Sequence, residues 1–168
     1  LVREGFHAAI RQGAGPWPGL VSERLFDRPP IIVVGSASAG RRLLGAQPEA
    51  LAREPLLGDA DLWRTWFAAA GLRINPTTVA VFNDAGLMLQ AVEQNIGLAL
   101  SREILAADGL CDGRLVQLSP VAITHPDAEP YHFVYPPGVR DWPPLAALRS
   151  WLREELDRSE RNVRKRRP

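Results

Sequence analysis

The chain has 168 residues, of which 46% are hydrophobic and 23% are charged, so it can bury a core as one domain or as two small lobes. Its net charge of +1 is unevenly placed: residues 158–168 contribute +5, which leaves 1–157 with a net charge of −4. A negative body excludes a nucleic-acid surface of clustered lysine and arginine, and no apolar run approaches the length of a bilayer span.

The two ends of the chain and its single cysteine indicate the cellular compartment of the protein and its relation to a longer chain. Cys111 cannot form an internal disulfide, which predicts a reducing cytoplasm. The first residues contain neither an initiator Met nor the regions of a signal peptide, so we expect a piece of a longer protein. The basic segment 158–168 is expected to be a disordered, solvated tail, with binding to a polyanion as the alternative.

Strands and short helices alternate in the first third of the chain. Three strands are predicted, at Phe6–Arg11, Leu20–Phe26 and Ile31–Val34. The Gly- and Pro-rich loop 13–19 separates the first two. Two short helices follow, at Ala39–Leu44 and Pro48–Arg53.

The middle of the chain gives the clearest helix. Asp61–Ala70 places its large apolar side chains on one face and ends at Gly71, the residue type that favours a helix C-terminus. A short strand is predicted before it, at Leu56–Leu57. After it, the β-branched segment Thr77–Phe82 predicts a strand, and Asn83 is the expected N-cap of a helix over 84–95.

The remaining elements continue the alternation. They are a strand at Gly97–Leu100, a helix at 102–107, strands at Arg114–Leu118 and Tyr131–Tyr135, and a last helix from Pro143 to about Asp157. Strands that alternate with helices in this way predict an α/β protein with a mostly parallel sheet.

The stretch IIVVGSASAGRRLL, residues 31–44, is similar to two catalytic motifs. Gly35 and Gly40 have P-loop spacing, but Arg41 and Arg42 stand where a P-loop needs Lys and Ser/Thr, which excludes that motif. Ser38 lies in a near-match to a nucleophile elbow, yet a triad needs an acid and a histidine, and His125 and His132 carry no supporting signature. We therefore predict a plain strand-to-helix turn and no catalytic residue, with a serine hydrolase using Ser38 as the lesser alternative.

Metal-ligating residues are sparse. Cys111, His7, His125 and His132 show no spacing typical of a metal site, so no metal and no cofactor are predicted. The neighbouring carboxylates Glu154 and Glu155 are expected on the exposed side of the last helix.

Polar residues at the carboxyl ends of predicted strands are the candidate ligand contacts. They are Arg11, Gln12, Gly58, Asn83 and Asp84. Arg11 suits a carboxylate, and Asp84, beside the free N–H groups of a helix N-terminus, suits an ammonium group. An amino acid or a similar zwitterion is therefore the predicted ligand. For Asn83 and Asp84, a simple helix cap is an equal alternative.

The order of several motifs resembles one family. HAAIRQGAGPWPGL (7–20) is similar to a stretch of LysR-type transcriptional regulators, and its Trp-Pro-Gly-Leu element resembles the subgroup of the glycine-cleavage-system activator. PLLGDADLWRTWFAAAGL, VFNDAGLMLQAVEQNIGLAL, DGRLVQL and the segment from YHFVYPPG to REEL follow in the same order, so the resemblance covers 1–157. Two departures are His7, where the family commonly has Asp, and Gly35-Ser36, where it usually has Ser-Pro.

The resemblance implies a two-lobed α/β effector-binding domain with the type 2 periplasmic-binding-protein-like fold, and a small ligand in the cleft between lobes. It places lobe I at 1–33 and 136–157, without its first strand and helix, and lobe II at 34–135. The implied function is regulation of transcription by a bacterial, cytoplasmic, non-enzymatic protein that forms dimers or tetramers and needs no membrane. DNA would bind through an N-terminal winged helix-turn-helix that this chain lacks. A stand-alone small-molecule-binding protein of the same fold is the alternative.

Overall fold

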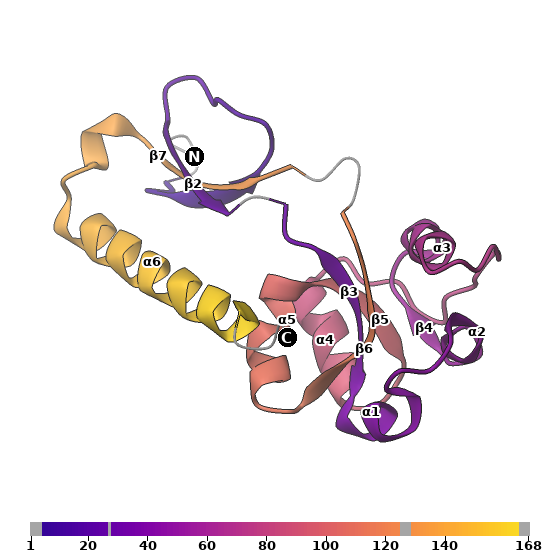
Figure 1. Cartoon of the computed structure of the whole chain (residues 1–168). Helices are drawn as coiled ribbons and strands as arrows, with labels where there is room; N and C mark the ends of the chain where they lie inside the picture. The colour runs from indigo at the N-terminus through magenta and orange to yellow at the C-terminus, as the bar shows by residue number, and fades with distance from the viewer. Residues whose placement is uncertain (1–4, 27, 125–128, 165–168) are drawn as a thin grey trace. The chain divides into compact units, whose positions relative to one another are not determined.

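The computed structural model describes residues 5–26, 28–124 and 129–164 (Figure 1). Contacts divide the chain into two compact units, which we call unit 1 and unit 2. Unit 1 combines Leu1–Arg28 with Pro126–Arg161, and unit 2 combines Pro29–His125 with Asn162–Pro168. Unit 1 is therefore built from two distant parts of the chain, whereas the sheet and helices of unit 2 come from one continuous part.

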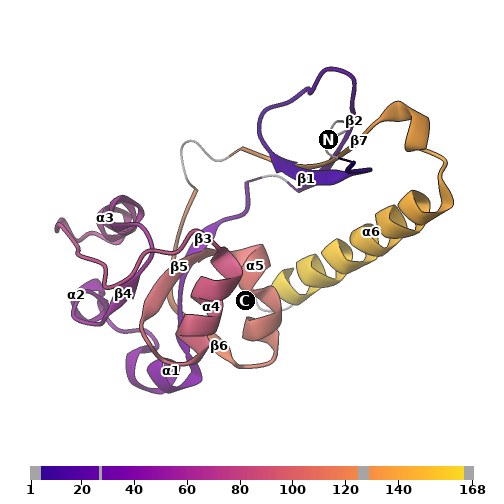
Figure 2. The same ribbon diagram turned by 180° about the vertical axis from the view of Figure 1, so that it is seen from behind.

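Unit 1 is a three-stranded sheet covered by a long helix (Figures 1 and 2). The strand order is β1-β7-β2, and both outer strands pair antiparallel with the central one. The elements are β1 (Ala9–Gln12), β2 (Val21–Phe26), β7 (Tyr131–Tyr135), the 3-10 turn η2 (Pro137–Val139) and α6 (Pro143–Arg164). Phe133, Tyr135 and Leu145 form the buried centre, because the apolar face of α6 packs on the side of the sheet to which the aromatic rings of β7 point.

Unit 2 is a four-stranded sheet with helices on both faces. Its strand order is β4-β5-β3-β6, with bounds β3 (Ile31–Ser36), β4 (Leu56–Leu57), β5 (Leu98–Arg102) and β6 (Leu115–Ile123). The helices are α1 (Ala37–Leu43), α2 (Pro48–Leu51), α3 (Ala60–Ala69), α4 (Ala85–Glu93) and α5 (Glu103–Cys111).

The central strand β3 explains the core of unit 2. Ile31 and Val33 pack with the aromatic residues of α3, while Ile32 and Val34 pack with α4 and α5 on the opposite face. All six residues of β3 are buried, because side chains alternate across a strand and both faces of this sheet are covered. The continuous apolar run of β3 follows from this arrangement.

Two expectations about the sheets are wrong. The sheet of unit 2 is mostly antiparallel: β3 pairs antiparallel with β5 and β6, and only the short β4 pairs parallel with β5. Thr77–Phe82 is not a strand but makes an isolated bridge from Ala80 to Leu57, with Val79 and Val81 exposed. Its β-branched residues favour extended backbone, but a ladder also needs a partner of matching length, and β4 is only two residues long.

The unit boundaries also differ from the expected lobe boundaries. β3 pairs only within the sheet of unit 2, and β7 pairs with β1 and β2, so the divisions lie near 28/29 and 125/126, not at 33/34 and 135/136. The helix α6 continues to Arg164, so residues 158–164 of the expected disordered tail are helical. Residues 165–168 and His125 lie outside the described residues. No helix in the described part of the chain has the length and apolar character of a membrane span.

Candidate functional site

The predicted residues of unit 1 lie at the end of β1. The guanidinium carbon of Arg11 is 5.1 Å from the ring centroid of Trp17, and the Nε2 of Gln12 donates to the backbone oxygen of Glu129 at 3.4 Å. Both side chains are exposed. The 5.1 Å distance corresponds to a cation–π contact, in which the guanidinium N–H groups of Arg11 can still bind a carboxylate.

Two residues without a predicted role support Arg11. The ring of Trp17 is edge-on to the ring of His132, with 5.3 Å between the ring centroids. His132 belongs to β7, where it lies directly opposite Arg11 of β1 on one side and Arg24 of β2 on the other. Directly opposite residues share one face of a sheet, so two arginines flank the buried His132. The sequence signal for this group was the tryptophan in the Gly- and Pro-rich loop after β1. It indicated a family motif but not a contact.

The predicted residues of unit 2 meet where β4 ends and α4 begins. Gly58 follows β4 with a φ of +95°, and its N–H donates to the oxygen of Ala80 at 2.8 Å. A Cβ at Gly58 would lie 3.2 Å from the Sδ of Met88 in α4. The turn after β4 therefore packs against the first turns of α4, close to Asp84.

Asp84, and not Asn83, is the N-cap of α4. Its Oδ1 accepts a hydrogen bond from the N–H of Leu87 at 2.8 Å, while Asn83 precedes the cap and is exposed. The carboxylate of Asp84 therefore satisfies one of the free helix N–H groups and adds a negative charge beside the rest. The structure thus brings Gly58, Asn83 and Asp84 together in unit 2, whereas Arg11 and Gln12 are consecutive in β1 of unit 1 and direct their side chains to opposite faces of its sheet. Their role in ligand binding stays a prediction.

The stretch 31–44 forms the predicted strand-to-helix turn. The Oγ of Ser36 accepts from the N–H of Ala39 at 3.1 Å, which caps α1, and donates to the Oδ1 of Asn95 at 2.6 Å. A Cβ at Gly40 would lie 2.7 Å from a methyl carbon of Val116, so this glycine allows α1 to approach β6. Ser38 lies in α1, and the described part of unit 2 contains no histidine that could act as its base.

A charged cluster of unit 1 was missed by sequence reasoning. The carboxylate of Glu23 accepts a hydrogen bond from the hydroxyl of Tyr135 and contacts Arg149 at 2.6 Å and Arg153 at 2.9 Å. Burial acts to raise the pKa of Glu23, but the bonds from Tyr135 and Arg149 and the two positive charges outweigh it and hold the pKa below its usual value. Burial and the bond to Glu23 raise the pKa of Tyr135. No sequence spacing signals this cluster, because its members come from three separate elements.

The described parts of the chain contain no group of three or more histidine, cysteine, aspartate or glutamate side chains that could hold a metal ion.

Comparison with known proteins points to one family. A family model described as the LysR substrate binding domain matches residues 1–157. The chain is 37% identical over 119 residues to the HTH-type transcriptional activator AmpR of Citrobacter koseri, a match that covers 70% of this chain and 41% of the relative. It is 29% identical over 153 residues to the glycine cleavage system transcriptional activator of Escherichia coli K12, covering 86% of this chain and 48% of the relative. The chain thus spans less than half the length of these curated relatives.

A solved structure agrees with the sequence comparisons. The effector domain of the transcriptional regulator AmpR of Pseudomonas aeruginosa matches with a TM-score of 0.70 and 28% identity, covering 96% of this chain and 78% of that one. The fold expected from the sequence, a two-lobed α/β effector-binding domain, is confirmed.

Proposed function

The chain belongs to the LysR substrate binding domain family, and on that premise we propose that it is the effector-sensing part of a bacterial LysR-type transcriptional regulator. The observation that carries this proposal is the match of the family model across 1–157, together with the likeness to a solved effector domain. DNA binding, assembly into dimers or tetramers and a cytoplasmic location belong to the same proposal for the full-length protein. An upstream coding region without a winged helix-turn-helix would favour a stand-alone small-molecule-binding protein.

The proposed effector is an amino acid or a similar zwitterion. Arg11, whose guanidinium group lies over Trp17, offers its N–H groups to a carboxylate, and Gln12 offers an amide at the same end of β1. Asp84 offers a carboxylate oxygen to an ammonium group, because only Oδ1 is used by the cap of α4. Gly58 and Asn83 contribute backbone and amide groups next to Asp84. Within unit 1, Arg11 is the proposed partner of a carboxylate, and within unit 2, Asp84 is the proposed partner of an ammonium group.

The proposed mechanism is a shift between conformations of the regulator. An effector that binds one conformation more tightly than another increases the population of the first, and the same coupling changes the affinity for DNA. The domain needs no covalent chemistry for this role. Its contribution is the difference in binding free energy between the two conformations.

The test is a thermal-shift screen of the chain with a panel of amino acids, followed by Asp84→Asn. Asparagine caps a helix as well as aspartate does, so Asp84→Asn removes the charge and keeps the cap. An effector at about 100 times its Kd stabilises the folded chain by about 2.7 kcal/mol, and we expect that gain to be lost in Asp84→Asn.

The matched control is Asp61→Asn, which removes an exposed charge from the first turn of α3. It is expected to respond like the wild type. A panel without any stabilising amino acid, or an unchanged response of Asp84→Asn, would contradict the zwitterion assignment.

A further inference from the structure

The face of the unit 1 sheet that points away from α6 contains a buried histidine. His132 of β7 is only 8% exposed. The loop from β1 to β2 lies on this side of the sheet, opposite α6 (Figures 1 and 2), and the ring of its Trp17 is edge-on to the imidazole ring. The proposed effector contact Arg11 shares this face, because it stands directly opposite His132. Three side chains from two strands and a loop therefore meet at one place.

The two nitrogens of the imidazole ring differ in their surroundings. Of the two, Nδ1 of His132 is the one that is buried without a hydrogen-bond partner among the described residues. A neutral imidazole carries its proton on one nitrogen and a lone pair on the other. Buried N–H groups without an acceptor are rare in proteins, and each one costs free energy. The proton is therefore placed on Nε2, the nitrogen at the tip of the ring, which makes this atom a hydrogen-bond donor.

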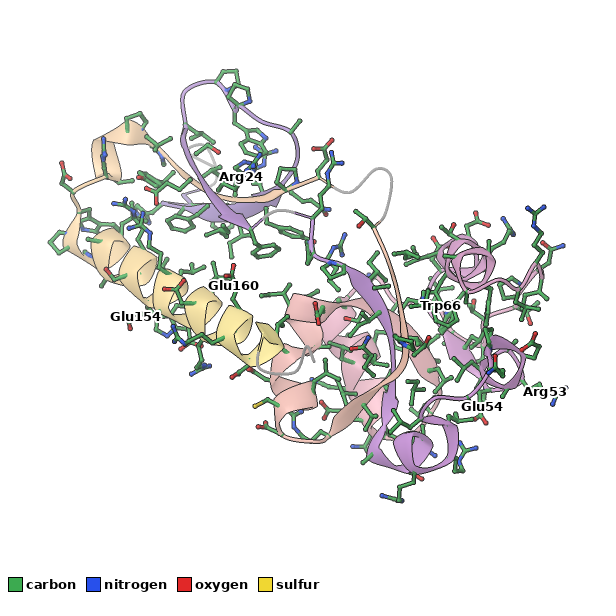
Figure 3. All side chains as sticks on the ribbon, viewed as in Figure 1. Arg24, Arg53, Glu54, Trp66, Glu154 and Glu160 are labelled. Carbon is green, nitrogen blue, oxygen red and sulfur yellow. The ribbon has the colours of Figure 1, made fainter. Side chains whose placement is uncertain are left out.

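The side chains around His132 favour a negatively charged acceptor. Arg11 stands opposite it on β1, and Arg24, labelled in Figure 3, stands opposite it on β2. The ring of Trp17 contacts both partners: its centroid is 5.1 Å from the guanidinium carbon of Arg11 and 5.3 Å from the centroid of the imidazole. The N–H groups of Arg11 and the Nε2–H of His132 therefore lie beside the same ring.

A carboxylate matches this pair of donors, and a carboxamide does not. The two oxygens of a carboxylate offer about four lone-pair sites, so they can accept from a guanidinium and an imidazole at once. A carboxamide has one oxygen, and its NH₂ group would face a donor. Donors on both sides thus favour the group that has only acceptors.

We propose that His132 is the second donor to the carboxylate of the effector: its Nε2–H binds one oxygen while Arg11 binds the other. This inference rests on the proposed function, in which Arg11 holds that carboxylate. It adds a residue that selects a carboxylate over a carboxamide. Trp17 is the positioning residue, because its ring contacts both donors.

The first experiment locates the imidazole proton. The whole chain is labelled with ¹⁵N-histidine, and the ring nitrogens are correlated with the ring protons by NMR at neutral pH. His132→Asn assigns the signals of His132, and the exposed His7, which packs on the ring of Trp142, is the reference. We expect the proton of His132 on Nε2. A proton on Nδ1 would overturn the proposal.

The second experiment titrates the same chain with acetate as the carboxylate probe and with acetamide as its uncharged equivalent. We expect saturable shifts of the His132 ring and the Trp17 indole N–H with acetate, and binding of acetamide weaker by at least about tenfold. The His7 ring should show no saturable shift. No saturable shift of the His132 ring up to about 100 mM acetate, or equal binding of acetamide, would overturn the proposal.

Two substitutions of His132 separate its nitrogens. His132→Gln places an amide nitrogen near the position of Nε2, whereas His132→Asn places it near that of Nδ1. We expect His132→Gln to bind acetate within about threefold of the wild type and His132→Asn to bind it about tenfold more weakly, with dispersed spectra as the check that both fold. His7→Asn is the control and should bind like the wild type. Unchanged affinity in His132→Asn, or equal losses in both variants, would refute the role of Nε2.

The outcome for His132 is separable from that for the proposed function. Stabilisation by an amino acid that is lost in Asp84→Asn but retained in His132→Asn would refute this inference and leave the zwitterion assignment standing. Acetate that binds at His132 in a chain that no amino acid stabilises would support the carboxylate subsite and contradict the zwitterion assignment.

Discussion

Replacement of Glu23 by glutamine tests whether the charged cluster holds α6 on the sheet of unit 1. Hydrogen bonds to charged groups contribute about 1.5–3 kcal/mol each. Arg153 is 64% exposed and adds little, so the bonds from Arg149 and Tyr135 dominate. Glutamine keeps one acceptor oxygen of the two, and we therefore expect Glu23→Gln to lower the free energy of unfolding by about 2 kcal/mol at pH 7.

The decrease in the free energy of unfolding caused by Glu23→Gln should depend on pH. The pKa of Glu23 in the folded chain lies below its ordinary value of 4.5, so its stabilisation is complete above that pH and is lost as the pH falls through the folded pKa. The difference between wild type and Glu23→Gln should therefore shrink as the pH is lowered from 4.5. Glu54→Gln is the control, since its partner Arg42 is 52% exposed, and it should cost much less.

Urea unfolding combined with amide hydrogen exchange measures both the size and the place of the effect. Exchange should accelerate in β2 and β7 of Glu23→Gln and stay unchanged in β3 and β5, because the cluster lies wholly in unit 1. Equal losses in Glu23→Gln and Glu54→Gln would refute the reasoning. A loss in Glu23→Gln that does not shrink below pH 4.5 would refute it as well.

Three further changes have defined outcomes. Gly97→Ala places a Cβ 2.5 Å from the backbone oxygen of Pro55 and should lower the free energy of unfolding by about 1–3 kcal/mol in chemical denaturation. Ser36→Ala removes the cap of α1 together with the bond to the asparagine after α4, and should lower the melting temperature by the equivalent of about 1–2 kcal/mol. Trp17→Leu removes the ring beneath Arg11 and should weaken effector binding several-fold in calorimetry while circular dichroism stays unchanged; undiminished affinity would contradict the role of the ring.

Local patterns predicted the elements of this chain well where one face or one cap determines them. The helix around Trp63 and Trp66 was predicted within one residue of each end, because its apolar stripe and Gly71, with a φ of +88°, both mark it. The strand at 31–34 was found from its apolar run. Strand direction could not be found in this way, because it depends on which distant strand becomes the neighbour, and alternation of elements does not encode that choice.

The candidate site was predictable only in part for the same reason. Arg11 and Asp84 could be chosen because they follow strands, but the ring beneath Arg11 and the identity of the cap depend on the path of the loops. The start of α4 is predictable only to within about one residue, so the sequence predicts Asn83 as the N-cap where the structure has Asp84. The cluster around Glu23 was out of reach, since Glu23 and Tyr135 are 112 positions apart in the sequence.

The pairing of β7 between β1 and β2 has a consequence for how the chain is made. During synthesis β1 and β2 leave the ribosome before unit 2 does, and their shared central strand β7 follows only after residues 29–125 have been translated. The sheet of unit 2 is complete by then and can fold as it emerges, which brings the two ends of its segment together and shortens the loop that β7 must close. The sheet of unit 1 therefore completes the pairing β1-β7-β2 only after the strands of unit 2 have been translated.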